Sequence, residues 1–196
     1  MRSEAKKQRH KQLINLIDSH PLMTDKEIAT TLQVSLGTVR LDRVTLSIPE
    51  VRERTRSMAE QATSRLKSMR LEEVIGDLVG LEPNKGALSV LFATRNTAFR
   101  HTDFVGDYYI YAQAASLAIA TIDKEMVVVG SARLKYNRPA YIGEKILARS
   151  KVGVHKGNKY VVSVRSTVEN REIFVGRFVV VSKDSIDKKS MEAKKC

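Results

Sequence analysis

One segment of this chain has almost no polar surface on any side of a helix, and it constrains the fold more than any other feature. Residues 106–123 read GDYYIYAQAASLAIATID, with aromatic, Ala, Leu and Ile residues all the way round. Such a helix has to be enclosed by other elements. Stretches rich in β-branched residues predict strands on both sides of it, at residues 73–82, 86–93, 125–136, 143–154, 159–168 and 171–181. The sequence therefore predicts an α+β fold in which an antiparallel sheet wraps around one buried helix.

The first 47 residues have a different pattern, with three short helical segments. Leu13, Ile14 and Ile17 share one face of the first helix, and Thr24 followed by Glu27 forms a capping box for the second. After a brief break, Ser35 is expected to cap the third. Its inward residues are expected to be Val39, then Leu41 or the neighbours of Asp42, and then Val44 and Leu46. Three short helices with such a break predict a helix-turn-helix.

A fourth helix is expected to begin near Pro49, where Ser47 and Glu50 repeat the capping-box spacing. A narrow apolar stripe along it is formed by Val51, Thr55, Met58, Ala62, Leu66 and Met69. The helix is either a connector packed on its own domain or a linker that pairs domains or protomers and presents arginines to DNA. The predicted boundaries are residues 1–47 for the helix-turn-helix, 48–70 for the amphipathic linker helix, 71–183 for the sheet domain and 184–196 for a disordered tail.

The balance of 34 Lys and Arg against 22 Asp and Glu gives a formal net charge of +12, which attracts polyanions. The alternative is charge that only keeps the protein soluble. Hydroxyl and guanidinium groups suit contacts to phosphates and guanine edges, so the exposed face of the third helix, with Arg40 and Arg43, and the linker supply the predicted DNA-binding residues. They are Ser35, Thr38, Arg40, Arg43, Arg52, Arg54 and Arg56.

Other chemistry is expected to be absent. The single cysteine is Cys196, and the four histidines have no metal-ligand spacing, so we expect no metal and a reducing compartment. No apolar run approaches the roughly 18 residues of a membrane span, and the N-terminus is too polar for a signal peptide. We therefore expect a cytoplasmic protein.

Two stretches carry a resemblance to a known family. The text QVSLGTVRLDRVTLSIPEVRERTRSMAEQA, whose first part resembles the reading head of DeoR-type winged helices, and YAQAASLAIATID at residues 111–123 resemble the fatty acid and phospholipid biosynthesis regulators of Firmicutes. The resemblance implies a homodimeric repressor with a hot-dog domain, released from operator DNA by malonyl-CoA or malonyl-acyl carrier protein. It implies no cofactor, no enzymatic activity and a bacterial cytoplasmic protein that associates with the nucleoid when bound to DNA. Phe99 falls where the family has a pocket Phe.

The same comparison shows departures in the expected ligand pocket. Gly106, Asp107 and Ala115 stand where the family pattern has Arg, Gly and Asn. A malonyl carboxylate that leaves water needs a cationic partner, so we expect a weaker malonyl preference unless Arg95, Arg100 or Arg133 supplies the charge. The pocket residues implied by the resemblance are Phe99, Arg100, Gly106, Asp107, Tyr108 and Ala115.

An enzyme is the main alternative. Thr102-Asp103 with Gly106 resembles the start of the buried helix in hot-dog thioesterases, where Asp103 would attack the thioester or activate water. Alternatively, Asp103 and Asp107 only occupy a helix start, where a carboxylate is favourable. We expect no catalytic residue and interpret the segment as a sensor pocket. A constitutive architectural DNA binder without a ligand is a third class.

Overall fold

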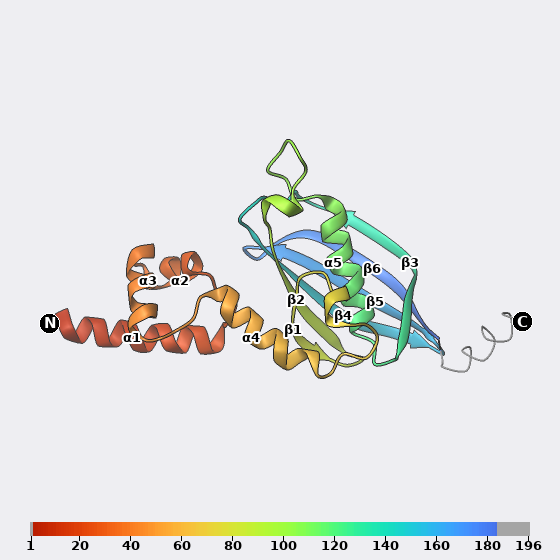
Figure 1. Cartoon of the computed structure of the whole chain (residues 1–196), viewed down its shortest axis with the longest axis horizontal. Coiled ribbons are helices and arrows are strands. Elements are labelled where there is room, and N and C mark those ends of the chain that lie inside the picture. The colour runs from red at the N-terminus through yellow and green to blue at the C-terminus, as the bar shows by residue number, and fades with distance from the viewer. Residues whose placement is uncertain (1, 184–196) are drawn as a thin grey trace, which may run out of the picture. The chain divides into compact units, whose positions relative to one another are not determined.

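The computed structural model describes residues 2–183 (Figure 1). Contacts along the chain form two compact units that divide between Met58 and Ala59. This division falls inside the helix α4, Val51–Thr63, whereas the sequence placed boundaries after residues 47 and 70. The predicted tail, 184–196, lies outside the described residues.

The first unit contains the three predicted N-terminal helices: α1 (Arg2–Ser19), α2 (Asp25–Leu32) and α3 (Leu36–Thr45). The predicted capping box of α2 is confirmed, because Thr24 N donates to Glu27 Oε2 at 2.6 Å and Glu27 N donates to Thr24 Oγ1 at 3.3 Å. A small core holds the helices together and consists of Leu13, Ile17, Ile28, Ala29 and Val39.

The orientation of α3 differs from the expectation. Val39 is buried as predicted, but Leu41 and Val44 are 71% and 75% exposed. Asp42 and Arg43 are buried instead, each only 4% exposed. Positions three and four residues after Val39 share its face of a helix, which places Asp42 and Arg43 inward and Leu41 outward. The sequence pattern misled because two charged residues occupy the inner face.

The helix α4 is shorter than predicted at both ends. Ser47 does not cap it: its φ of 55° and the bond from Ile48 N to Arg43 O, at 2.9 Å, end α3 instead. At the other end, Leu66 and Met69 pack against the core of the second unit, and Ser68 Oγ donates to Ile119 O at 3.0 Å. These contacts hold residues 64–70 on the second unit, so the predicted helix does not continue to residue 70.

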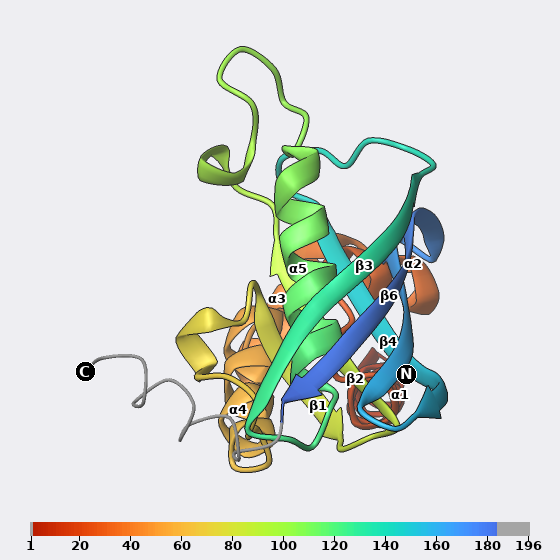
Figure 2. The same ribbon diagram turned by 90° about the vertical axis from the view of Figure 1, so that its right-hand side faces the viewer.

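The second unit has the predicted architecture. Its six strands are all antiparallel and lie in the order β1-β2-β4-β5-β6-β3. Their bounds are β1 Asp77–Glu82, β2 Gly86–Phe92, β3 Met126–Tyr136, β4 Lys145–Lys156, β5 Lys159–Val168 and β6 Arg171–Lys183. Two short 3₁₀ helices lie at Leu71–Glu73 and Arg95–Thr97. The helix α5, Asp107–Ala120, lies across one face of the sheet (Figure 2).

Buried polar groups fix α5 on the sheet. Gln113 is fully buried in α5 and donates from Nε2 to Ser89 Oγ on β2 at 3.1 Å. At the end of α5, Thr121 Oγ1 and Ser150 Oγ on β4 lie 2.6 Å apart, and Ser150 Oγ accepts from Ala87 N at 2.8 Å. Because buried polar groups bond only in defined positions, these contacts set how α5 is rotated and where its N-terminal end lies.

Candidate DNA-binding helix and acyl-thioester site

The outer side of α3 carries some of the predicted DNA-binding residues. Ser35 caps the helix by accepting from Thr38 N at 3.1 Å, and the hydroxyls of Ser35 and Thr38 lie 2.9 Å apart. The Arg40 side chain is 65% exposed, and its Nε is 3.9 Å from Asp25 Oδ2. This weak exposed ion pair leaves the guanidinium able to reach a ligand. Ser35 and Arg40 are exposed and Thr38 is half-buried at the start of the helix.

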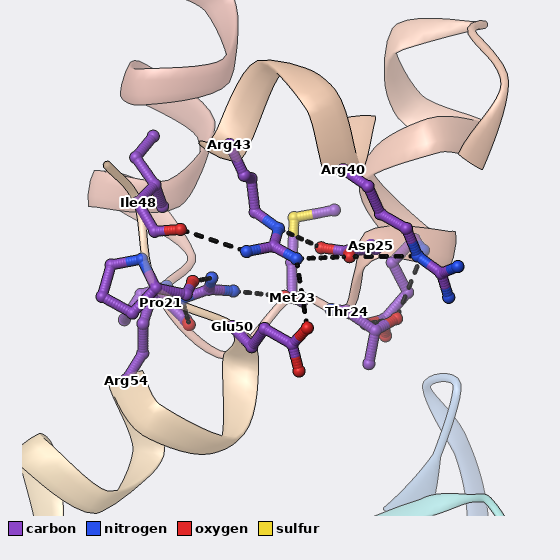
Figure 3. A network of polar contacts seen from close by, with 11 residues as sticks. Pro21, Met23, Thr24, Asp25, Arg40, Arg43, Ile48, Glu50 and Arg54 are labelled. Carbon is purple, nitrogen blue, oxygen red and sulfur yellow. Dashed lines mark hydrogen bonds and ion pairs between the residues drawn. The ribbon is translucent and has the colours of Figure 1, made fainter. Parts of the chain in front are cut away.

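Arg43, by contrast, is part of the interior of the first unit (Figure 3). Its Nε and Nη2 donate to the two carboxylate oxygens of Asp25 at 2.6 and 2.8 Å, and its Nη1 donates to Ile48 O at 3.1 Å. The bidentate bond to Asp25 raises the pKa of Arg43. The prediction that Arg43 lies on the exposed face of α3 is therefore wrong: the side chain joins the start of α2 to the loop before α4.

Arg54 was predicted to project from the linker helix and is also buried, at 9% exposure. It donates to the carbonyl oxygens of Pro21 and Met23, both labelled in Figure 3, and to that of Pro49. Burial lowers the pKa of Arg54, and nearby Arg43 lowers it further. Its guanidinium satisfies loop carbonyls, which fixes the first turns of α4 onto the helix-turn-helix. Among the predicted linker arginines, Arg52 and Arg56 are exposed.

A second buried charge on α3 was not predicted to have a role. Asp42 Oδ2 accepts from Arg9 Nε at 2.6 Å and Oδ1 accepts from Arg9 Nη2 at 3.1 Å, and His10 Nε2 lies 3.0 Å from the same Oδ1. The hydrogen bond from Arg9 lowers the pKa of Asp42. Asp42 therefore anchors α3 to α1. No periodicity in the sequence could indicate it, because its partners lie more than 30 residues away.

Four aromatic residues gather at the N-terminal end of α5. The rings of Phe99 and Tyr108 meet edge to face with centroids 5.9 Å apart, and Tyr108 lies 4.8 Å from Tyr109. Tyr136 on β3 reaches the same helix end, where its hydroxyl donates to Asp107 O at 3.3 Å. Phe99 and Tyr108 remain 42% and 54% exposed. The structure thus brings two predicted pocket residues together and adds Tyr109 and Tyr136, for which the sequence had no signal.

The predicted Gly106 and Asp107 form the start of α5. A Cβ on Gly106 would lie 2.6 Å from Tyr108 Cε1, so the glycine makes room for the aromatic ring. The Asp107 carboxylate accepts from Tyr108 N at 3.0 Å and so already occupies the positive end of the helix. Burial raises the pKa of Tyr136, and the charge of Asp107 adds to that. Ala115 is half-buried further along α5 and packs against the core.

The loop before α5 holds an open hollow of about 290 Å³, lined by Arg95, Arg100, His101, Thr102 and Asp103. Arg95 donates to Thr102 O at 2.8 Å and Arg100 O at 2.6 Å, and lies 3.4 Å from the carboxylate of Asp103. Asp103 is 79% exposed at its side chain. The Arg100 side chain lines the hollow and makes no ion pair within residues 2–183, which leaves it free to bind an anion.

Arg133 is the third arginine considered for the missing cation. It lies opposite Arg177 in the pairing of β3 with β6, next to the Ala132 and Phe178 pair. Phe178 is fully buried in the core that α5 covers. Because neighbouring residues of a strand point to opposite faces, Arg133 faces away from α5. Within one chain, Arg100 is therefore the arginine best placed to meet a ligand at this end of α5.

Two further absences concern residues 2–183. This part of the chain contains no cluster of three or more His, Cys, Asp or Glu that could hold a metal ion. None of its helices is long and apolar enough to cross a membrane.

Comparisons with solved structures establish the fold. The sigma28-regulated virulence protein Cj0977 of Campylobacter jejuni aligns with a TM-score of 0.60 and 22% identity, covering 66% of this chain and 92% of that one. The protein smu.793 of Streptococcus mutans, solved bound to acetyl-CoA, aligns with a TM-score of 0.50 and 16% identity, covering 59% and 93%. Such low identities show the fold alone, and that fold is the predicted hot-dog fold.

Comparisons with curated sequences reach further. The chain is 39% identical over 180 residues to the transcription factor FapR of Thermoanaerobacter sp. (strain X514), covering 92% of this chain and 90% of that protein. It is 40% identical over 177 residues to FapR of Bacillus velezensis, covering 89% and 94%. No protein-family model matches the chain. Because these matches span both the helix-turn-helix and the hot-dog domain, the chain belongs to the FapR family of transcription factors.

Proposed function

We propose that this transcription factor represses fatty acid and phospholipid biosynthesis genes and is released from its operator by malonyl-CoA or a related acyl-thioester. The observation that supports this most is that one chain unites a helix-turn-helix with a hot-dog domain and matches FapR proteins over about nine-tenths of its length. It would act in the bacterial cytoplasm on the nucleoid, and it would need no cofactor. An acyl group carried by acyl carrier protein is an alternative form of the ligand.

The DNA contacts are assigned to those predicted residues of the first unit whose side chains are not buried. Ser35, Thr38 and Arg40 lie at the start and outer side of α3, and exposed Arg52 and Arg56 follow on α4. Hydroxyl and guanidinium groups in these positions suit phosphates and base edges of operator DNA. Arg43 and Arg54 act through the fold, because their guanidinium groups are already bonded to Asp25 and to loop carbonyls.

The ligand is assigned to the N-terminal end of α5. Exposed aromatic rings of Phe99 and Tyr108 offer an apolar wall, and the adjacent helix end polarises a thioester carbonyl. The acetyl-CoA bound to smu.793 of S. mutans supports an acyl-thioester as the class of ligand. The Asp107 carboxylate at this helix end repels a malonyl carboxylate, so a weak malonyl preference is proposed unless Arg100 compensates.

The active form is proposed to be a homodimer. On β3, Leu134 lies opposite Gly176 and Tyr136 lies opposite Phe174, so both side chains belong to the face of the sheet that packs on α5. Leu134 and Tyr136 are nevertheless 37% and 42% exposed. β3 is also an edge strand of 11 residues. Long edge strands with apolar residues tend to pair with another chain. Sedimentation velocity should find a dimer that Leu134→Lys weakens. The control is Val154→Lys, at a more exposed apolar residue near the β4–β5 hairpin, which should leave the dimer intact.

The experiment that tests the function is a binding titration of the full chain against DNA from upstream of lipid-synthesis genes, followed by competition with malonyl-, acetyl- and butyryl-CoA. Release of the DNA by one of these thioesters supports the repressor. Binding that none of them affects indicates an architectural DNA binder, and no sequence-selective binding contradicts the proposal.

Hydrolysis of the thioester is the alternative, and the geometry gives it little support. The Asp103 carboxylate is exposed and lies 3.4 Å from Arg95, outside the dry environment in which a carboxylate becomes reactive. We expect no appreciable thiol release from acyl-CoAs, and we expect Asp103→Asn to leave ligand-induced DNA release intact. Turnover at about 1 per second or faster that Asp103→Asn abolishes would instead identify an enzyme.

A further inference from the structure

We propose that Leu41 and Val44, on the outer side of α3, contact the C5-methyl groups of thymines in the major groove and so determine which DNA sequence this protein binds. The proposal rests on the proposed function, in which α3 enters the groove. It concerns two residues that the sequence pattern placed in the core.

Leu41 and Val44 are the two most exposed large apolar side chains among the described residues of the first unit, at 71% and 75%. They follow Gly37 and Arg40 at helical spacing, so these four residues form one outward stripe along α3. The core of the first unit is completed without them, by Val39 on the inner side and by Leu46 beyond the helix. A single exposed apolar residue needs no explanation, whereas two neighbours beside an exposed arginine indicate a partner surface.

Gly37 is an independent observation that points to a close partner. It lies in the first turn of α3, where glycine disfavours a helix, and its φ is not in the left-handed region. A Cβ at this position would meet only Ser35 Oγ, at 3.7 Å, so alanine fits within the protein. The missing side chain is therefore explained by a surface that approaches the backbone from outside.

The residue types along this outward stripe of α3 match the major groove of duplex DNA as the surface that approaches it. Arg43, the other arginine of α3, is bonded to Asp25, which leaves Arg40 as the guanidinium on the outer side of this helix. Base reading by the stripe thus depends mainly on its two aliphatic side chains. Thymine is the base that presents a methyl group in the major groove, and aliphatic side chains contact it directly. Arg40 beside them supplies the cation for a phosphate or a guanine edge.

The test begins with the full-length protein and a library of random duplexes, from which the most tightly bound sequence is selected. That duplex is then made with thymine and with deoxyuridine in each half-site, because uracil keeps the base pair and lacks only the methyl group. Wild-type protein should bind the uracil duplex about fourfold more weakly for each contacted methyl, the factor expected for burying one such group. Leu41→Ala and Val44→Ala should each bind the thymine duplex more weakly and lose part of this discrimination.

Ile14→Ala is the matched control, since Ile14 is a 39% exposed apolar residue on α1, and it should keep the full preference for thymine. Gly37→Ala should raise the melting temperature and yet weaken DNA binding. Equal affinity for the two duplexes, or full discrimination in both Leu41→Ala and Val44→Ala, overturns the inference while DNA binding stands. A changed oligomeric state of either variant without DNA assigns the stripe to a second protein copy and also overturns it. If no sequence is enriched, the proposed function fails as well.

Discussion

The helices α3 and α5 distribute their residues in opposite ways. Most apolar residues of α5 pack into the core of the second unit, where Leu117, Ala114 and Ala118 are fully buried. α3 buries the charged Asp42 and Arg43 and exposes Leu41 and Val44. A helix that exposes apolar groups while it buries charged ones is stabilised by specific bonds and keeps its outer face for a partner. Along most of its length α5 is part of the core, and only its N-terminal end is exposed.

The contrast teaches that an arginine in a basic DNA-binding module is not necessarily a DNA contact. Arg43 and Arg54 are bonded within the first unit, whereas Arg40 is exposed. Substitution of the buried charges should affect stability, and substitution of the exposed ones should affect DNA binding.

The largest effect is expected from Arg43→Ala. It leaves the Asp25 carboxylate and Ile48 O without their donors, and removing one partner of a buried ion pair costs about 3 kcal/mol. Urea unfolding followed by the helical circular dichroism signal should report this loss for the first unit. Arg40→Ala is the control and should cost less than about 0.5 kcal/mol, because its ion pair to Asp25 is exposed. Equal stabilities of the two variants would remove the distinction between the two arginines.

Features that depend on local sequence patterns could be predicted, whereas contacts between residues far apart in the chain could not. The strands, the enclosed helix α5 and the Thr24 cap depend on local patterns, such as alternation or a four-residue spacing, and all three were predicted. The burial of Arg43 depends on Asp25, 18 residues away, and that of Arg54 on carbonyl oxygens more than 30 residues away. Tyr136 reaches the end of α5 from β3, 29 residues along the chain. No single-sequence pattern encodes such distant pairs. The predicted C-terminal end of α4 failed for the same reason, because Ser68 bonds to Ile119, 51 residues away.

The next effect concerns DNA affinity. Arg40→Ala should weaken binding to the selected duplex by about 2 kcal/mol if the guanidinium reads a base, with relaxed specificity at that position. If it holds a phosphate, the loss should be uniform across sequences and the salt dependence of binding should become shallower. Fluorescence anisotropy at several salt concentrations distinguishes the two. Unchanged affinity in Arg40→Ala, with the fold intact, would take this side of α3 out of the groove.

A smaller effect follows from Asp42 and acid. Its pKa is lowered in the folded protein, chiefly by the hydrogen bond from Arg9, so its contribution is present above the unfolded pKa of about 3.9 and is lost as the pH falls below that. Asp42→Asn should cost about 1.5 kcal/mol at pH 7 and make the stability of the first unit less dependent on pH below about 4. Thermal unfolding across this range is the measurement. An acid dependence identical to that of the wild type would show that α1 is not held by this carboxylate.

The smallest effect tests the outward end of α5. Asp107→Asn removes a carboxylate that accepts from Tyr108 N at the helix start, and should cost about 0.5 kcal/mol of stability. The same change removes the repulsion of a malonyl carboxylate, so malonyl-CoA should gain over acetyl-CoA in releasing DNA, and Arg100→Ala should reverse the gain if Arg100 supplies the cation. Arg133→Ala is the matched control, because Arg133 faces away from α5. Strong malonyl selectivity in the wild type that survives Arg100→Ala would show that the carboxylate binds away from Asp107, and a selectivity that follows Arg133 instead would place the ligand on the other face of the sheet.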